Sequence, residues 1–284
     1  FSPDPYNQPL GKAMTSTEVD VVSKDFKYPQ SFRVNLAVEK MLPFDIRGTL
    51  EGIYTKKMND IYYQNINIEE SGKMLNNFKD KRPLYGSSIS SDYTSVILLS
   101  NTDEGYSYNI TGKLEKSFGF GLDLMAAYTY GRSMGVNDGT SSQAYSNWTY
   151  NESWRGSNNP EVSYADFDQP HRIIASASYK VAYGKNLATS IALFYSGNSG
   201  SRYSLCYNGD LNKDGVKGND LIYVPTNSEI DAMTFMPLTG LTSDVQRNDL
   251  RAYINSEESG LSGLQGKYAE RNGLITPFEH HFDL

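Results

Sequence analysis

Residues 106–130 read YSYNITGKLEKSFGFGLDLMAAYTY, and neighbouring side chains in this stretch alternate in kind. The even-numbered positions are almost all apolar or aromatic, whereas the odd-numbered ones are mostly polar residues or glycine. A period of two places successive side chains on opposite faces of a β-strand. The pattern therefore predicts two amphipathic strands, over 106–115 and 118–130, that meet at a corner at Lys116 and Ser117.

The same alternation of apolar and polar residues recurs elsewhere in the chain. Four further windows show it: residues 32–39, 46–54, 172–181 and 187–196. Most of these runs are longer than the roughly five or six residues of a typical globular strand. Their lengths are close to those of tilted strands that cross a bilayer, which need about 9 to 11 residues. We therefore expect long strands with one apolar and one polar face.

The segments between the predicted strands differ sharply in length. Short turns join the paired windows, at residues 42–44, 116–117 and 182–186. Long segments separate the pairs, at residues 1–30, 57–104, 132–170 and 198–276. A compact soluble domain rarely carries a structureless loop of more than about 15 residues. Short turns at one end and long loops at the other are typical of an outer-membrane β-barrel, whose short turns face the periplasm.

The composition of the 284 residues supports strands and excludes several other classes of protein. It holds 22 Tyr, 12 Phe and 2 Trp beside 24 Gly, a mixture that favours strands over helices. A mean hydropathy of −0.53 and the lack of a long apolar run in the sequence exclude a transmembrane helix. A net charge of −7 argues against nucleic acid as a partner.

The sequence lacks the motifs that common catalytic centres require. A single cysteine, Cys206, excludes a disulfide framework and a cysteine-based zinc site. There are three histidines but no HExxH motif. The GxSxG, P-loop and dinucleotide-binding motifs are absent from the sequence as well. We therefore expect that the protein is not an enzyme.

Aromatic residues fall near the ends of the predicted strands, where a membrane-spanning sheet meets the two interfaces. The outer end would carry six tyrosines: Tyr54, Tyr106, Tyr108, Tyr128, Tyr130 and Tyr195. Phe118 and Phe120 would lie near the inner interface. A soluble sandwich or fibre is the alternative explanation of the alternation, although strand length and loop asymmetry favour the barrel.

These patterns together predict an all-β fold, a section of a transmembrane antiparallel β-barrel with long extracellular loops. About seven strands would be present, too few to close such a barrel. One short loop helix is predicted at residues 243–254, where Ser243 and Gln246 have the spacing of a capping box. Its apolar stripe would be Val245, Leu250, Tyr253 and Ile254. This helix would form an external lid or merely fill space.

Four segments of the chain resemble the barrel of a known family of receptors. They are DFKYPQSFRVNLAVEKMLP (residues 25–43), DFDQPHR (166–172), GDLNKDGVKGNDLIYVP (209–225) and YAERNGLITPFEHHFDL (268–284). In this order they are similar to the C-terminal barrel of TonB-dependent outer-membrane receptors. The resemblance covers nearly the whole chain and is closest to the Oar-like receptors of Bacteroidetes-type bacteria.

This resemblance implies a plugged barrel of about 22 strands in the bacterial outer membrane, which imports a ligand with energy supplied through TonB. Residues 1–284 would form a partial barrel domain, without the plug, the TonB box, the early strands and the last strands. The chain starts at Phe1 without Met or a signal peptide, as expected of a mature product or an internal piece. The partners that the resemblance implies are outer-membrane lipid, TonB through the plug and an unknown nutrient ligand, with a surface lipoprotein as a further candidate. Nucleic acid is not expected, because of the net charge.

An acidic segment in the last long loop has the spacing of a calcium loop. Asp210, Asn212 and Asp214 place oxygen ligands at alternate positions, and a turn glycine follows. The twelfth position is Leu221 rather than Glu, and Asp220 lies one residue earlier. The segment therefore predicts either a calcium (Ca2+) site with Asp220 as the last ligand or an Asx-rich turn without metal.

The loop 132–170 contains both tryptophans and several polar neighbours. Five of its residues are candidates for ligand binding: Tyr145, Trp148, Tyr150, Trp154 and Arg155. Aromatic faces beside amides and a guanidinium suit the capture of a sugar or a peptide. The alternative is that these side chains form the internal core of the loop.

The polar face of the predicted strands would line the interior of the barrel. Its charged residues are Arg33, Glu39, Arg47, Glu51, Lys113, Glu115 and Asp123. They could contact a plug or a permeating ligand, but their mixed signs favour pairing with one another first. His171 would either sense protons in the lumen or, by the favoured interpretation, anchor the start of its strand by hydrogen bonds. His280 and His281 should point to opposite faces.

The sequence thus predicts an outer-membrane TonB-dependent receptor whose external loops capture a ligand and whose plugged barrel conducts it. The alternative is a secreted or cell-surface β-rich binding protein or adhesin without transport activity.

Overall fold

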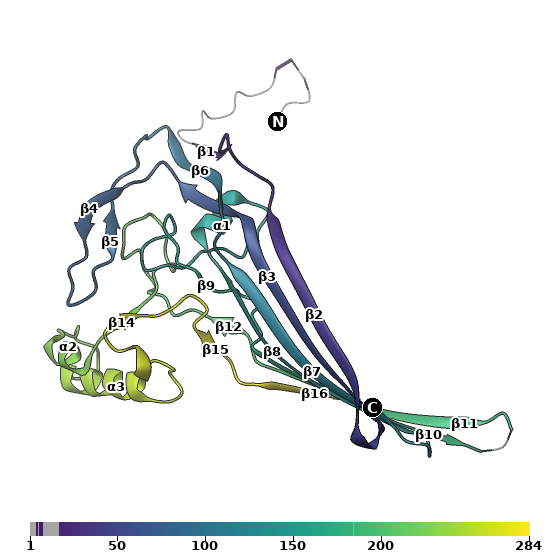
Figure 1. The fold of residues 1–284 in the computed structure, drawn as a ribbon. Coiled ribbons are helices and arrows are strands. Elements are labelled where there is room, and N and C mark those ends of the chain that lie inside the picture. The colour runs from purple at the N-terminus through teal and green to yellow at the C-terminus, as the bar shows by residue number, and fades with distance from the viewer. Residues whose placement is uncertain (1–3, 5, 8–16, 184) are drawn as a thin grey trace.

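The computed structural model describes residues 4, 6–7, 17–183 and 185–284, so much of the predicted loop 1–30 lies outside the described residues. Within them, six long strands and the five-residue β16 pair side by side in an antiparallel sheet, in the order β2-β3-β7-β8-β10-β11-β16 (Figure 1). Their bounds are β2 Gln30–Leu42, β3 Ile46–Asn65, β7 Tyr106–Ser117, β8 Leu122–Gly135, β10 His171–Ala182, β11 Ala188–Asn198 and β16 Glu279–Asp283. No described strand joins β2 to β16, so this section stays open, and the predicted partial barrel is confirmed.

Shorter elements occupy the long connections. The far end of β3 leaves the main sheet to pair with β6 (Tyr93–Thr102), and β6 pairs in parallel with β1 (Thr17–Val22). The other strands are β4 Glu70–Met74, β5 Pro83–Tyr85, β9 Ser163–Tyr164, β12 Arg202–Tyr203, β13 Tyr223–Val224, β14 Lys267–Tyr268 and β15 Leu274–Ile275. The helices are α1 Ala144–Thr149, α2 Asn227–Ala232 and α3 Ser243–Asn255, with 3-10 turns at Pro43–Asp45 and Ser262–Leu264.

The corner between β7 and β8 lies later than the sequence predicts. It occupies residues 118–121 rather than 116–117, and both phenylalanines of the predicted strand lie in this turn. Gly121 adopts a left-handed conformation with φ +93°, and a Cβ there would lie 2.5 Å from the carbonyl oxygen of Lys180. A residue with a side chain fits such a position poorly, so the glycine determines where the chain reverses.

The prediction of a loop over residues 57–104 is partly wrong, because this segment contains the extension of β3 and the whole of β6. Alternation is a weak signal here since both faces of these strands are partly covered. Tyr63 of β3 and Ile97 of β6 are buried in one cluster with Trp148 of α1. A strand that is covered on both faces does not show the period of a half-exposed strand.

The predicted helix is present as α3, although its cap differs. The hydroxyl of Thr242, one residue before the predicted cap, accepts a hydrogen bond of 3.3 Å from the backbone of Val245. The apolar stripe is half right: Leu250 and Ile254 pack in a buried cluster, whereas Val245 and Tyr253 are exposed. Two further helices, α1 and α2, have six residues each, too few to show a helical period clearly.

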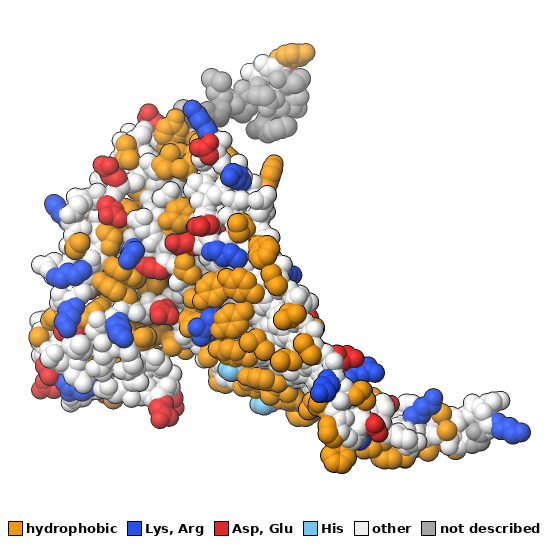
Figure 2. Space-filling model, in the orientation of Figure 1, with side chains coloured by type: hydrophobic (Ala, Val, Ile, Leu, Met, Phe, Trp, Pro, Cys, Tyr) orange, Lys and Arg blue, Asp and Glu red, His pale blue; other side chains and the backbone are white. Residues whose placement is uncertain are grey.

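The two faces of the long sheet differ as the alternation predicts. The strand register places Leu36, Leu50 and Ile110 on one face, where their exposed fractions are 71%, 60% and 51%. Figure 2 shows hydrophobic side chains gathered over the slanting strands. Compact apolar clusters lie in the loops instead, one of them formed by Val224, Ile230, Ile254 and Leu261. Among the described residues, no helix is both long and apolar enough to cross a bilayer.

Candidate functional site

The seven predicted lumen-facing residues share one face of the sheet by register: Arg33, Glu39, Arg47, Glu51, Lys113, Glu115 and Asp123. Several of them contact oppositely charged or polar neighbours on that face. The closest contacts are Lys113 Nζ to Glu115 Oε2 at 2.9 Å, Arg33 Nε to Thr55 Oγ1 at 3.0 Å, Asn35 Nδ2 to Glu51 Oε1 at 3.0 Å and Arg47 Nε to Glu39 Oε1 at 3.8 Å. Mutual pairing is therefore present, and contact with a plug or ligand stays a prediction.

The tyrosines expected at the outer end of the strands lie on the opposite, apolar face. The rings of Tyr108 and Tyr130 contact each other across two strands, with ring centres 6.1 Å apart. His171 also lies on this apolar face and does not face the lumen. Its Nδ1 is 2.7 Å from the hydroxyl of Tyr128. His280 forms a matching contact of 2.9 Å with Tyr195. Hydrogen bonds thus hold both histidines among aromatic rings.

The five candidate ligand-binding residues do not form one site. Trp148 is 2% exposed, donates a 2.8 Å hydrogen bond to Asn158 and contacts Tyr145, so this pair packs inside the loop. Trp154 stacks on Tyr268 with ring centres 4.1 Å apart, and the Arg155 guanidinium lies over the Trp154 ring. Tyr150 stands apart from both groups and is 77% exposed.

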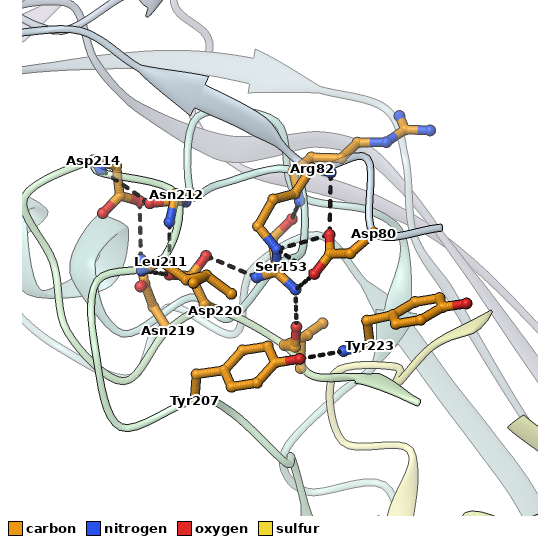
Figure 3. A network of polar contacts seen from close by, with 12 residues as sticks. Asp80, Arg82, Ser153, Tyr207, Leu211, Asn212, Asp214, Asn219, Asp220 and Tyr223 are labelled. Atoms are coloured by element: carbon orange, nitrogen blue, oxygen red, sulfur yellow. Dashed lines mark hydrogen bonds and ion pairs between the residues drawn. The ribbon is translucent and has the colours of Figure 1, made fainter. Parts of the chain in front are cut away.

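A buried cation that no local sequence pattern predicts joins two of the long loops. Arg82 has no exposed side-chain surface and contacts Asp80 at 3.0 Å and Asp220 at 3.2 Å (Figure 3). It also donates to the carbonyl oxygen of Leu221 and lies 5.1 Å from the Tyr207 ring centre. Burial alone would lower the pKa of Arg82, but its two carboxylate partners raise it above the usual value.

The Asp-rich segment forms a series of Asx turns. The Asn212 Oδ1 accepts from the backbone of Asp214, and the Asp210 carboxylate accepts from Gly215 at 3.0 Å. Asp220 Oδ2 accepts from the backbone of Leu211 and Asn212, while its Oδ1 faces Arg82. Across the described residues, no group of three or more His, Cys, Asp or Glu side chains is arranged to hold a metal. Calcium binding here stays a prediction.

A polar cavity of about 230 Å³ lies between the loop after β8, helix α1 and the segment before β15. The side chains that matter for its chemistry are Asn137, Asp138, Tyr150, Glu152, Asp166 and Arg271. Burial raises the pKa of Asp138 to about 6 and also raises that of Glu152. Of these residues, only Tyr150 belongs to the predicted site. Four others lie in the same loop 132–170 but are not among the predicted residues, and Arg271 comes from a distant part of the chain.

Arg271 is fixed by the chain around this cavity. Its Nη1 and Nη2 donate to the carbonyl oxygens of Val136 and Gly135, and Nη1 also bonds Asn151. Its Nε is buried and has no hydrogen-bond partner within the part of the chain that the structure describes. A buried donor without a partner is costly, so this atom identifies a place where a ligand could bind.

The structure is an open antiparallel sheet whose long strands have one apolar and one polar face. Short turns lie at one end of the sheet and folded loops at the other. These features define a membrane β-barrel protein. The family described as an outer membrane beta barrel domain matches residues 1–249. The chain belongs to this family, and it lies in the bacterial outer membrane, with its barrel in the membrane lipid. The alternative of a water-soluble sandwich is therefore wrong. No curated protein and no solved structure matches the chain.

Proposed function

We propose that this protein is a TonB-dependent receptor that captures a nutrient outside the cell and imports it through a plugged barrel. The observation that carries the proposal is that each outer edge of the seven-stranded sheet, at β2 and at β16, is not paired along its outer side by another described strand. In hydrocarbon every backbone donor and acceptor must be paired, so the spanning sheet has to be completed by further strands. A barrel wider than these strands can hold a plug domain, as the resemblance implies.

The loops support capture of a ligand at the mouth. They carry their own buried clusters and the Arg82 network, so they hold fixed shapes. The charged face of the sheet offers a polar path below them. Binding sites built on loops that a rigid scaffold positions are common in proteins.

The proposal is tested by comparing two deletions in the source bacterium, one of this gene and one of its tonB gene. Both are expected to abolish growth on the same nutrient within a defined panel of glycans, peptides and iron chelates. Uptake of a small sugar through porins serves as the control and should persist in both strains. If deletion of this gene impairs only adhesion while every nutrient is still taken up, the protein is an outer-membrane adhesin and not a transporter.

A further inference from the structure

The polar cavity near Tyr150 combines hydrogen-bond acceptors and donors in one enclosed space. Asp138 and Glu152 lie on its wall, and Asp166 approaches from the segment before β10. In the described part of the chain, none of these three carboxyl groups forms an ion pair with a lysine or arginine. Asp166 accepts a hydrogen bond of 2.6 Å from Asn272 and is hydrogen-bonded to Asp138. The carboxyl oxygens that these contacts leave free can accept hydrogen bonds from a ligand.

The same cavity holds a donor that lacks an acceptor. Arg271 is 3% exposed, and its Nε is the buried atom that has no partner among the described residues. Because the two Nη atoms are engaged by backbone carbonyl oxygens and Asn151, the guanidinium cannot turn to satisfy Nε elsewhere. A ligand that fits here must accept a hydrogen bond from Arg271 and donate to the carboxyl groups.

Charge narrows the class of ligand. An ammonium group or a metal ion would suit the carboxyl groups but cannot accept a hydrogen bond, so it would leave the Arg271 Nε without a partner. A carboxylate or phosphate would suit Arg271 but would meet three acidic side chains. A neutral hydroxyl group satisfies both requirements, since it is a donor and an acceptor at once.

The size of the cavity and the residue at its edge narrow the class of ligand further. The cavity, at about 230 Å³, exceeds the about 150 Å³ that holds a benzene ring, so one six-membered ring with its substituents fits. Tyr150 lies at the edge with 77% of its surface exposed, and its ring offers a flat apolar contact. Hydroxyl groups at the edge of a ring and C–H groups on its face are the features of a sugar.

We propose that this cavity binds one ring of a neutral sugar, with its hydroxyl groups on Asp138, Glu152 and Arg271 and its apolar face on Tyr150. This inference rests on the proposed uptake function and names the class of ligand that the receptor would take.

The test uses the native protein, extracted from outer membranes in lauryldimethylamine oxide, because a detergent with a sugar headgroup would compete. The probes are the methyl α-glycosides of glucose, galactose and mannose, and binding is measured by saturation-transfer difference NMR. At least one glycoside is expected to bind saturably. Tyr150→Ala and Asp138→Asn should each weaken that binding about tenfold, by loss of ring contact and of a charged acceptor respectively.

Tyr253→Ala is the matched control, since Tyr253 is an exposed tyrosine on α3, outside the cavity; it should leave affinity unchanged. Heat-modifiable migration on gels checks that each variant keeps its barrel, and the Tyr150 variant changes only a surface side chain. The proposal is overturned if none of the glycosides binds, or if both cavity variants bind as tightly as the wild type. Binding of N-acetyl-lysine methylamide or Ca2+ that these variants weaken would overturn the neutral-sugar class.

The two proposals can fail separately. Sugar binding in a strain whose nutrient uptake does not depend on TonB would leave this inference standing and refute the transport function. TonB-dependent uptake by a protein that binds none of the glycosides would refute this inference alone.

Discussion

Arg82 and Asp220 have no exposed side-chain surface, yet they come from loops that are far apart in the sequence. Removing one partner of such a buried pair leaves an unpaired charge, which is strongly destabilising. The Asx turns at Asp210 and Asp214 could be predicted from local spacing, because their hydrogen bonds join residues two to five positions apart. The Arg82 network and the Arg271 cavity could not, because their members meet only after the loops have folded.

The carboxyl group of Asp138 makes the stability of the mouth loops depend on pH. Burial raises its pKa from 3.8 to about 6 in the folded protein, so the folded state binds the proton more tightly than the unfolded chain. The contribution of this group to the stability of the loops is therefore fully present below about pH 3.8 and is lost as the pH rises through about 6. Asp138→Asn, which stays neutral, should flatten this dependence.

The dependence of loop stability on pH is measured by hydrogen exchange of the backbone amides of residues 136–152. The rates are corrected for the intrinsic effect of pH on exchange. Equal slopes of protection against pH in the wild type and in Asp138→Asn would contradict the assignment to this carboxyl group.

At the scale of strands and turns, alternation located the elements that cross the membrane. It worked for β2, β7, β10 and β11 because each has one face toward lipid and one toward polar neighbours. It failed for the β7–β8 corner, where backbone conformation matters more than side-chain polarity. It also failed for β6, which is partly covered on both faces. The sequence thus predicts the sheet well and the loops poorly, since loop structure depends on distant contacts.

Gly121 offers a direct test of that corner. Gly121→Ala places a Cβ 2.5 Å from the Lys180 carbonyl oxygen at a positive φ, and it should destabilise the protein by more than about 1 kcal/mol. Gly119→Ala, in the same turn with no heavy atom within 4 Å of its Cβ, is the control and should change stability little. Urea unfolding of the native protein in detergent micelles compares the two. A larger loss for the Gly119 variant would refute the explanation of the turn.

At the scale of the whole molecule, the sheet separates lipid on one side from polar contacts on the other. Leu36 and Ala37 are neighbours in the middle of β2 and point to opposite faces. Leu36→Arg should destabilise the membrane-inserted protein by about 2–4 kcal/mol, because it places a charge in hydrocarbon. Ala37→Arg places the same charge beside Glu51 on the polar face and should cost far less.

Equilibrium unfolding from lipid vesicles measures both variants. The assignment of faces is wrong if the Ala37 variant loses more stability than the Leu36 variant.

The buried apolar clusters lie in the loops and on the far end of β3 and on β6, outside the lipid-facing part of the sheet, which gives the two halves of the protein different sources of stability. The strands depend on backbone pairing in lipid, whereas the loops fold by excluding water, as a soluble domain does. Recognition at the mouth can therefore change by mutation without disturbing insertion into the membrane. Under the proposed uptake function, exchanging whole loops between related barrels should transfer the choice of ligand from one protein to the other.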